Sequence, residues 1–196
     1  HRCTMRPMHV GQVEVQALVD GELVGDGAFV VRVVSGAASA ERSRAEATPS
    51  STKVGEGVKV SIEAFDALGQ PVGKGEDPFE VHVESEAGTR KLDLTDLCNG
   101  KYEATVVPEQ AGPHRVLVKL GGRHVGGSLL SVDAADGDAS AGRSSAQWSG
   151  LEKLVVGEEG SFDVLCNDRY GNLTDSGEVG VRACWSGGGA EEPVTV

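Results

Sequence analysis

Residues 99–132 hold three segments in which apolar and polar side chains alternate, and Gly- or Pro-containing turn signals separate them. Asn99-Gly100 accepts the positive φ of a tight turn, and Gly121-Gly122 does the same further on. Period two indicates half-buried strands, because successive side chains of a strand point to opposite faces. The third strand is expected over Val125–Val132. The residues predicted to point inward from the first two strands are Tyr102, Ala104, Val106, His114, Val116, Val118 and Leu120.

Parts of this pattern occur again along the chain. Residues 11–31 align with residues 112–132 without a gap, at an offset of 101 residues, as from Gly11 to Gly112. In the other direction, Val54-Gly55-Glu56 recurs as Val156-Gly157-Glu158, and Asp66-Ala67-Leu68-Gly69 as Asp168-Arg169-Tyr170-Gly171, at an offset of 102 residues. A period of about a hundred residues is typical of immunoglobulin-like domains and too long for a solenoid unit. The sequence therefore predicts a tandem array with one complete repeat in the middle.

The first half of the middle repeat supplies the remaining strands. A weak strand is expected around Ser51–Val54 and a clear one from Val58, with Val58, Val60, Ile62 and Ala64 on one face. After the long loop 66–78, a strand over Phe79–Glu84 is expected to turn Phe79, Val81 and Val83 inward, and the next carries Leu92 and Leu94. Seven strands in this order predict an all-β, two-sheet immunoglobulin-like sandwich.

The middle repeat carries a series of short motifs in a fixed order and spacing. The motifs are Val54-Gly55-Glu56, Phe65-Asp66-Ala67-Leu68-Gly69, Thr95-Asp96, Asn99-Gly100-Lys101-Tyr102, Pro108, Ala111-Gly112 and Gly122-Arg123-His124-Val125-Gly126-Gly127-Ser128. In this order and spacing they resemble the filamin-type (ABP280) immunoglobulin-like repeat. The resemblance implies tandem immunoglobulin-like repeats of filamin type. It also implies a divergent branch, because Gly127-Ser128-Leu129-Leu130 departs from the family's usual Gly-Ser-Pro followed by an aromatic residue.

The predicted domain organisation follows from the repeat offset and from composition. Two segments lack period two and are rich in Ala, Ser and charge, so they are interpreted as linkers. The chain is expected to be a fragment of a longer protein, and residues 48–133 are expected to fold alone. The predicted parts are 1–36 (final strands of one repeat), 37–47 (linker), 48–133 (complete repeat), 134–147 (linker) and 148–196 (first half of a third repeat).

Composition and motifs argue against several functions. The net charge of −12 disfavours nucleic acid and anionic membranes as partners, since both require clustered Lys and Arg. The five histidines are scattered, and no nucleophile elbow or phosphate-binding loop is present in the sequence. We therefore predict that the chain is not an enzyme and has no catalytic residue, cofactor or metal.

Cysteines and one sequon give opposite indications about the compartment. Cys98 has no cysteine partner in the middle repeat, whereas Cys166 and Cys184 fall in one repeat but, by the family's arrangement, on opposite sheets. This usage favours a reducing compartment and leaves a Cys166–Cys184 bridge open. Asn172-Leu173-Thr174 is a candidate glycosylation site and points to the secretory pathway.

Two non-catalytic functions remain open. The first is a scaffold or crosslinker in a cytoskeletal assembly, an actin network or a cilium; the second is an extracellular adhesion ectodomain such as that of a gamete-surface filamin-repeat protein. Partners are expected to be other proteins and neighbouring repeats of the same chain, without direct membrane contact. The resemblance implies that a partner adds as a strand in a groove between the third and fourth strands. The matching residues are Phe79, Glu80, Val81, His82, Val83, Glu84, Leu92 and Leu94.

Overall fold

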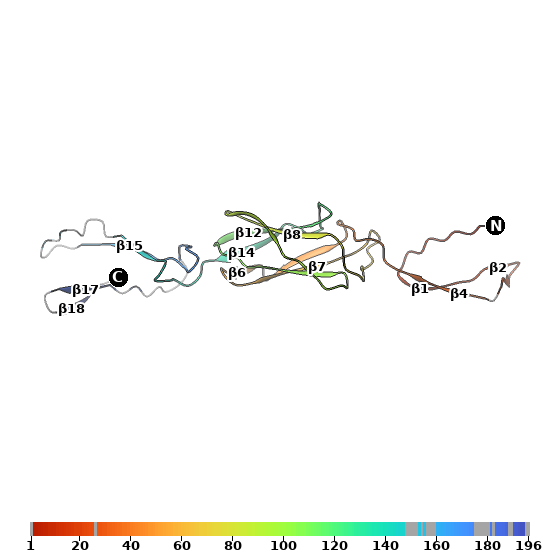
Figure 1. The fold of residues 1–196 in the computed structure, drawn as a ribbon, viewed down its shortest axis with the longest axis horizontal. Helices are drawn as coiled ribbons and strands as arrows, with labels where there is room; N and C mark the ends of the chain where they lie inside the picture. Colours follow the sequence, from red (N-terminus) through yellow and green to blue (C-terminus); the bar gives the residue numbers. More distant parts are fainter. Residues whose placement is uncertain are drawn as a thin grey trace. The chain divides into compact units, whose positions relative to one another are not determined.

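The structure is a computed structural model that describes residues 2–25, 27–147, 153, 155, 160–174, 181, 183–187 and 190–194. It divides into two compact units, one of residues 1–52, 57–107 and 113–133, the other of residues 53–56, 108–112 and 134–196. Every regular element in the described part of the chain is a β-strand (Figure 1). Within these residues no helix is long and apolar enough to cross a bilayer. The recurrence predicted at Val156-Gly157-Glu158 lies outside the described residues.

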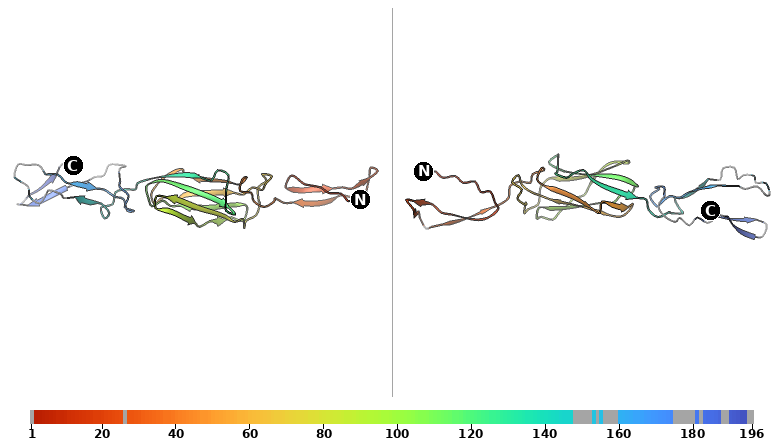
Figure 2. Two further views of the ribbon diagram at one scale, coloured as in Figure 1. Left: turned by 90° about the horizontal axis from the view of Figure 1, so that it is seen from above. Right: turned by 180° about the vertical axis from the view of Figure 1, so that it is seen from behind.

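Two sheets form a sandwich in the middle of the chain, as Figures 1 and 2 show from three directions. The strand order is β10-β11-β7-β5 in the first sheet and β6-β14-β12-β8-β9 in the second, with β13 paired to β12. The predicted all-β sandwich is therefore confirmed. The strands are β5 (Arg44–Thr48), β6 (Ser51–Lys53), β7 (Val58–Glu63), β8 (Phe79–Ser85), β9 (Gly88–Leu92), β10 (Thr95–Asp96), β11 (Lys101–Val106), β12 (Gly112–Leu120), β13 (Arg123–His124) and β14 (Leu130–Ala135).

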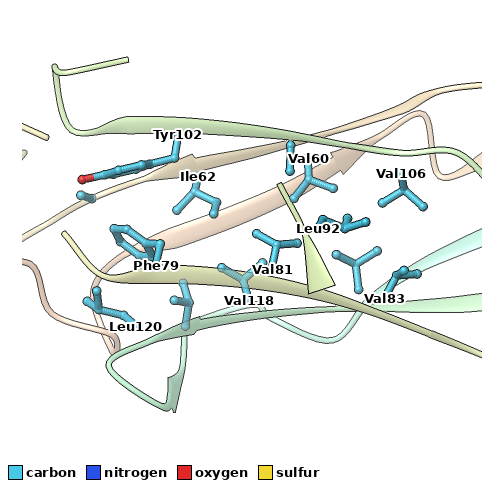
Figure 3. Packing of buried hydrophobic residues seen from close by; sticks show 14 of the residues in the cluster. Val60, Ile62, Phe79, Val81, Val83, Leu92, Tyr102, Val106, Val118 and Leu120 are labelled. Carbon is cyan, nitrogen blue, oxygen red and sulfur yellow. The ribbon is translucent and has the colours of Figure 1, made fainter. Parts of the chain in front are cut away.

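The core lies between these sheets and follows the predicted alternation. Side chains of β7 and β11 face those of β8 and β12, and Figure 3 shows them pointing toward one another from the two layers. Burying each large apolar side chain contributes about 1.5 to 3 kcal/mol. The inward faces predicted for these strands are confirmed. The buried residues that the sequence predicts are Val58, Val60, Ile62, Ala64, Phe79, Val81, Val83, Leu92, Tyr102, Ala104, Val106, His114, Val116, Val118 and Leu120.

The predicted linker 37–47 is wrong where β5 forms. β5 pairs antiparallel with β7, placing Ala45 opposite Ile62 and Ala47 opposite Val60. Both alanines are half-buried and pack against the core, and Ala40 is buried in it. Alanine has low strand propensity and a small side chain, which explains why period two was not recognised here. The sandwich therefore begins before the predicted boundary at residue 48.

The second predicted linker, 134–147, is wrong at both of its ends. β14 continues through Ala135, and β15 (Ser145–Gln147) pairs antiparallel with β16 (Asp163–Leu165). In that pair Ala146 lies opposite Val164, so a small alanine again occupies the half-buried position.

The final strand of the sandwich starts later than predicted. Val125 is buried, but Gly127 and Leu129 have φ values of 78° and 117°, which interrupt an extended strand. Gly126 makes an isolated parallel bridge to Arg44. Residues 125–129 therefore form a turn, and β14 begins at Leu130.

Further strand pairs occur toward both ends of the chain. β1 (Gly11–Val15) pairs with β4 (Phe29–Val33), and β2 (Leu18–Val19) pairs with β3 (Glu22–Leu23). Later in the chain, β17 (Ala183–Gly187) pairs with β18 (Ala190–Val194). All three pairs are antiparallel.

Tyr102 joins the long loop 66–78 to the core. Its ring packs on Phe79 with centroids 4.8 Å apart. Its hydroxyl donates to Oδ2 of Asp77 and accepts from the Asp77 backbone N–H, each at 3.0 Å. Burial, together with the adjacent Asp77 carboxylate, raises the pKa of Tyr102 to about 12. The fold therefore stabilises the neutral phenol.

Candidate interaction edge

The strand predicted to bind a partner is not an edge strand. β8 pairs antiparallel with β12 on one side and with β9 on the other. Both rows of its backbone groups are therefore occupied, and the predicted groove between the third and fourth strands is closed by hydrogen bonding. Gly88–Leu92 follows a tight turn and pairs directly with β8, which leaves no room for a partner strand between them.

The predicted groove residues are divided between two environments. Four of the apolar ones point into the core and are buried, so they are not available to a partner; these are Phe79, Val81, Val83 and Leu92. Leu94 is half-buried against the same core. Glu80, His82 and Glu84 lie on the opposite, outer face of the sheet and are half-buried.

The outer face of β8 carries the polar side chains Glu80, His82 and Glu84. Glu80 accepts a hydrogen bond from Nζ of Lys91 at 2.6 Å, and this bond and its charge lower the pKa of Glu80. His82 lies between Lys91 of β9 and Leu117 of β12, and its Nδ1 is buried without a hydrogen-bond partner. Leu117 is itself only 8% exposed. On this face the Glu80 carboxylate is thus paired with the Lys91 ammonium group.

β9 is the free edge of the second sheet. Among the described strands none pairs with its outer side, and its first four residues are exposed. On the core side Arg90 donates to the carbonyl oxygen of Val107 at 2.9 Å. On the outer side Lys91 is held by Glu80. Two basic side chains of this edge strand, Arg90 and Lys91, are thus held by hydrogen bonds, one on each face of the sheet.

The other edges of the sandwich are shorter or partly covered. β10 has two residues and β6 has three. β5 has five residues, but Gly126 bridges to Arg44 and Gly127 lies near the carbonyl oxygen of Ala45. β9, also of five residues, is therefore the longest uncovered edge of the described sandwich.

Two aspartates organise loops and were not predicted as important. Asp66 accepts from the backbone N–H groups of Gly36, Leu68 and Gln70 at 2.9 to 3.0 Å. These bonds lower the pKa of Asp66, with Gly36 the largest cause. In the second unit Asp168 accepts in the same way from Gly137, Tyr170 and Asn172. The sequence signal for this role is the Asp-x-x-Gly motif that recurs in the two loops.

The side chains of three of the four cysteines and of the candidate glycosylation site lie in the described residues. No group of three His, Cys, Asp or Glu side chains suited to a metal occurs in the described residues. Cys3, Cys98 and Cys166 are free thiols, and the side chain of Cys184 lies outside the description. Asn172 is half-buried with its amide hydrogen-bonded.

The middle of the chain is an immunoglobulin-like β-sandwich with an unpaired strand edge at β9, and comparison with known proteins specifies its family. Residues 37–129 match the Filamin/ABP280 repeat, so this part of the chain is a filamin repeat. The family is structural, and the match begins before β5, in agreement with the corrected boundary. Filamin-C of Rattus norvegicus and that of Mus musculus are each 32% identical over 84 residues, which is 42% of this chain and 3% of theirs. The chain thus spans a small part of these relatives.

Solved structures show the same fold. The FdeC adhesin of Escherichia coli has a TM-score of 0.58 and 20% identity over 89% of this chain and 55% of its own. Invasin, described as a bacterial integrin-binding protein, has a TM-score of 0.53 and 23% identity over 85% of this chain and 34% of its own. At these identities the likeness establishes the architecture alone.

Proposed function

We propose that the chain is part of a tandem array of filamin-type repeats that acts as a scaffold or crosslinker in a cytoskeletal assembly, an actin network or a cilium. The observation that carries this proposal is a complete filamin repeat with an uncovered, five-residue strand edge at β9. The same aspartate turn occurs within this repeat at Asp66 and again after it at Asp168, which supports repetition. The free thiols at Cys3, Cys98 and Cys166 agree with a reducing compartment.

An extracellular adhesion ectodomain is the second candidate. It is supported by the sequon at Asn172 and is compatible with the fold shared with FdeC and invasin. Localising the tagged parent protein separates the two functions. Signal at the cytoskeleton or cilium supports the scaffold, and surface labelling of intact cells supports adhesion.

We place partner binding at β9 rather than at β8. An extended peptide that pairs with β9 gains main-chain hydrogen bonds, and its alternate side chains give specificity. A partner residue that lies beside Lys91 would face an ammonium group that is already paired with the Glu80 carboxylate. We therefore expect an acidic or hydroxyl-bearing side chain at that position of the partner. The partner is therefore an extended protein segment of this chemistry.

Proline substitutions in β9 test this edge. Thr89→Pro and Arg90→Pro each remove one backbone N–H. Neighbouring N–H groups of a strand point to opposite sides, one toward β8 and the other toward the free side of β9. One of the two variants therefore removes a donor that a partner strand would use. We expect the variant that keeps its melting transition to capture partners from a native extract at least about tenfold less well.

Lys74→Pro is the matched control, because Lys74 is exposed in the loop before β8. It should leave capture unchanged. If both β9 variants fold and retain every partner of the wild type, binding does not run through β9.

A further inference from the structure

The side chain of Asn172 connects two segments of the second compact unit. Its Nδ2 donates to the carbonyl oxygen of Glu109 at 3.0 Å and to Oδ2 of Asp168 at 2.8 Å. Its Oδ1 accepts from the backbone N–H of Ala111 at 3.0 Å. An asparagine amide has two N–H donors, so both hydrogens of Nδ2 are in use. The loop 167–174 is thereby tied to the segment 108–112.

Asp168 fixes the orientation of this amide. The residue is fully buried, at 0% exposure, and it accepts backbone N–H bonds from Gly137, Tyr170 and Asn172. Burial acts to raise the pKa of Asp168, but the hydrogen bonds, first that of the Asn172 side chain, outweigh it and lower the pKa. The carboxylate therefore stays ionised, and its bond from Asn172 is charge-assisted.

A second contact brings the same loop to the turn at residues 53–56. The Arg169 guanidinium stacks on the Tyr170 ring, 4.7 Å from its centroid, and donates to the Tyr170 hydroxyl at 2.7 Å. Both side chains lie so close to Gly55 that a Cβ there would collide with them. The loop is thus in contact with two segments far away in the sequence.

We infer that Asn172 is a latch between the loop 167–174 and the segment 108–112, and that this latch and an N-linked glycan at Asn172-Leu173-Thr174 are mutually exclusive. Glycosylation bonds Nδ2 to the anomeric carbon of a sugar from an activated donor; the donor's leaving group departs with the electron pair, and one amide hydrogen is lost as a proton. One remaining hydrogen cannot serve both Glu109 and Asp168, and the sugar would occupy the place of one acceptor.

The loop after β7 lacks the equivalent latch. At the offset of 102 residues Gln70 takes the place of Asn172. In the described residues Gln70 donates its backbone N–H to Asp66, and its side chain makes no hydrogen bond. The aspartate turn is common to both loops, whereas the latch belongs to one.

Amide exchange at Ala111 tests the latch in the full chain made without glycosylation. Because the Ala111 N–H donates to Asn172, Asn172→Ala should speed its exchange roughly tenfold while Val118, in the core of the sandwich, is unchanged. Thr174→Val is the matched control: it abolishes the sequon but keeps Asn172, so Ala111 stays protected. Unchanged Ala111 exchange in a folded Asn172→Ala chain would overturn the latch.

The wild-type chain made in a eukaryotic secretory pathway tests exclusivity without any substitution. Intact mass should show Asn172 unmodified, or a glycosylated fraction in which the Ala111 amide exchanges roughly tenfold faster than in the unglycosylated chain. A glycosylated chain with a protected Ala111 amide would contradict the inference. This arm remains decisive if Asn172→Ala fails to fold.

Discussion

Val116→Asp is expected to leave the filamin repeat unfolded at room temperature. Val116 lies at the centre of β12 with 0% exposure, opposite Val83 of β8. A carboxylate there would be removed from water without a partner, at a cost of several kcal/mol, and the whole stability of a domain is about 5 to 15 kcal/mol. Circular dichroism with a thermal melt should show no cooperative transition.

Val107→Asp provides the control for this substitution. Val107 follows β11 and is 36% exposed, so its carboxylate remains hydrated. The melt should then stay close to that of the wild type, within about 0.5 kcal/mol. A native-like transition in Val116→Asp would show that the sheets do not pack on this face.

Gly100→Ala should destabilise the repeat by about 2 to 4 kcal/mol, from left-handed strain together with overpacking. Gly100 has φ of 79°, and an added Cβ would overlap the carbonyl oxygen of Val72. Its own carbonyl accepts the N–H of Ala64, so the turn joins the end of β7 to the long loop. Urea unfolding measures the loss.

Gly122→Ala separates strain from collision. Gly122 has φ of 81° but no atom lies within 4 Å of its Cβ position, so only the left-handed strain of about 1 to 2 kcal/mol is expected. Equal losses in the two variants would mean that Val72 does not constrain Gly100.

The sequence predicted the interior strands well because their inward residues are large. In β7, Val58, Val60 and Ile62 alternate with polar residues, and a strand places all three on one face. β5 was missed because Ala45 and Ala47 give the same period with a weak signal. The size of the inward apolar side chains, and not the period of two alone, therefore decided which strands could be predicted.

The interaction edge was less predictable because it depends on pairing between strands. The residues of β8 were assigned to the correct faces, yet nothing in Phe79–Glu84 indicates which strand takes the place beside it. The contacts of Asn172 were equally hidden, since Glu109 and Ala111 lie some sixty residues earlier. Such long-range partners are set by topology and cannot be obtained from local pattern.

The most direct test of the account compares residues 37–135 with residues 48–135 as separate proteins. We expect residues 37–135 to give a β-type far-UV spectrum and one cooperative melt, because they include β5 and both sheets. Residues 48–135 lack nearly all of β5, so Val60 and Ile62 lose their neighbours Ala47 and Ala45, and this protein should melt at least ten degrees lower or not fold. A helical spectrum or absent transition for residues 37–135, or equal melting of the two, would contradict the proposed filamin sandwich.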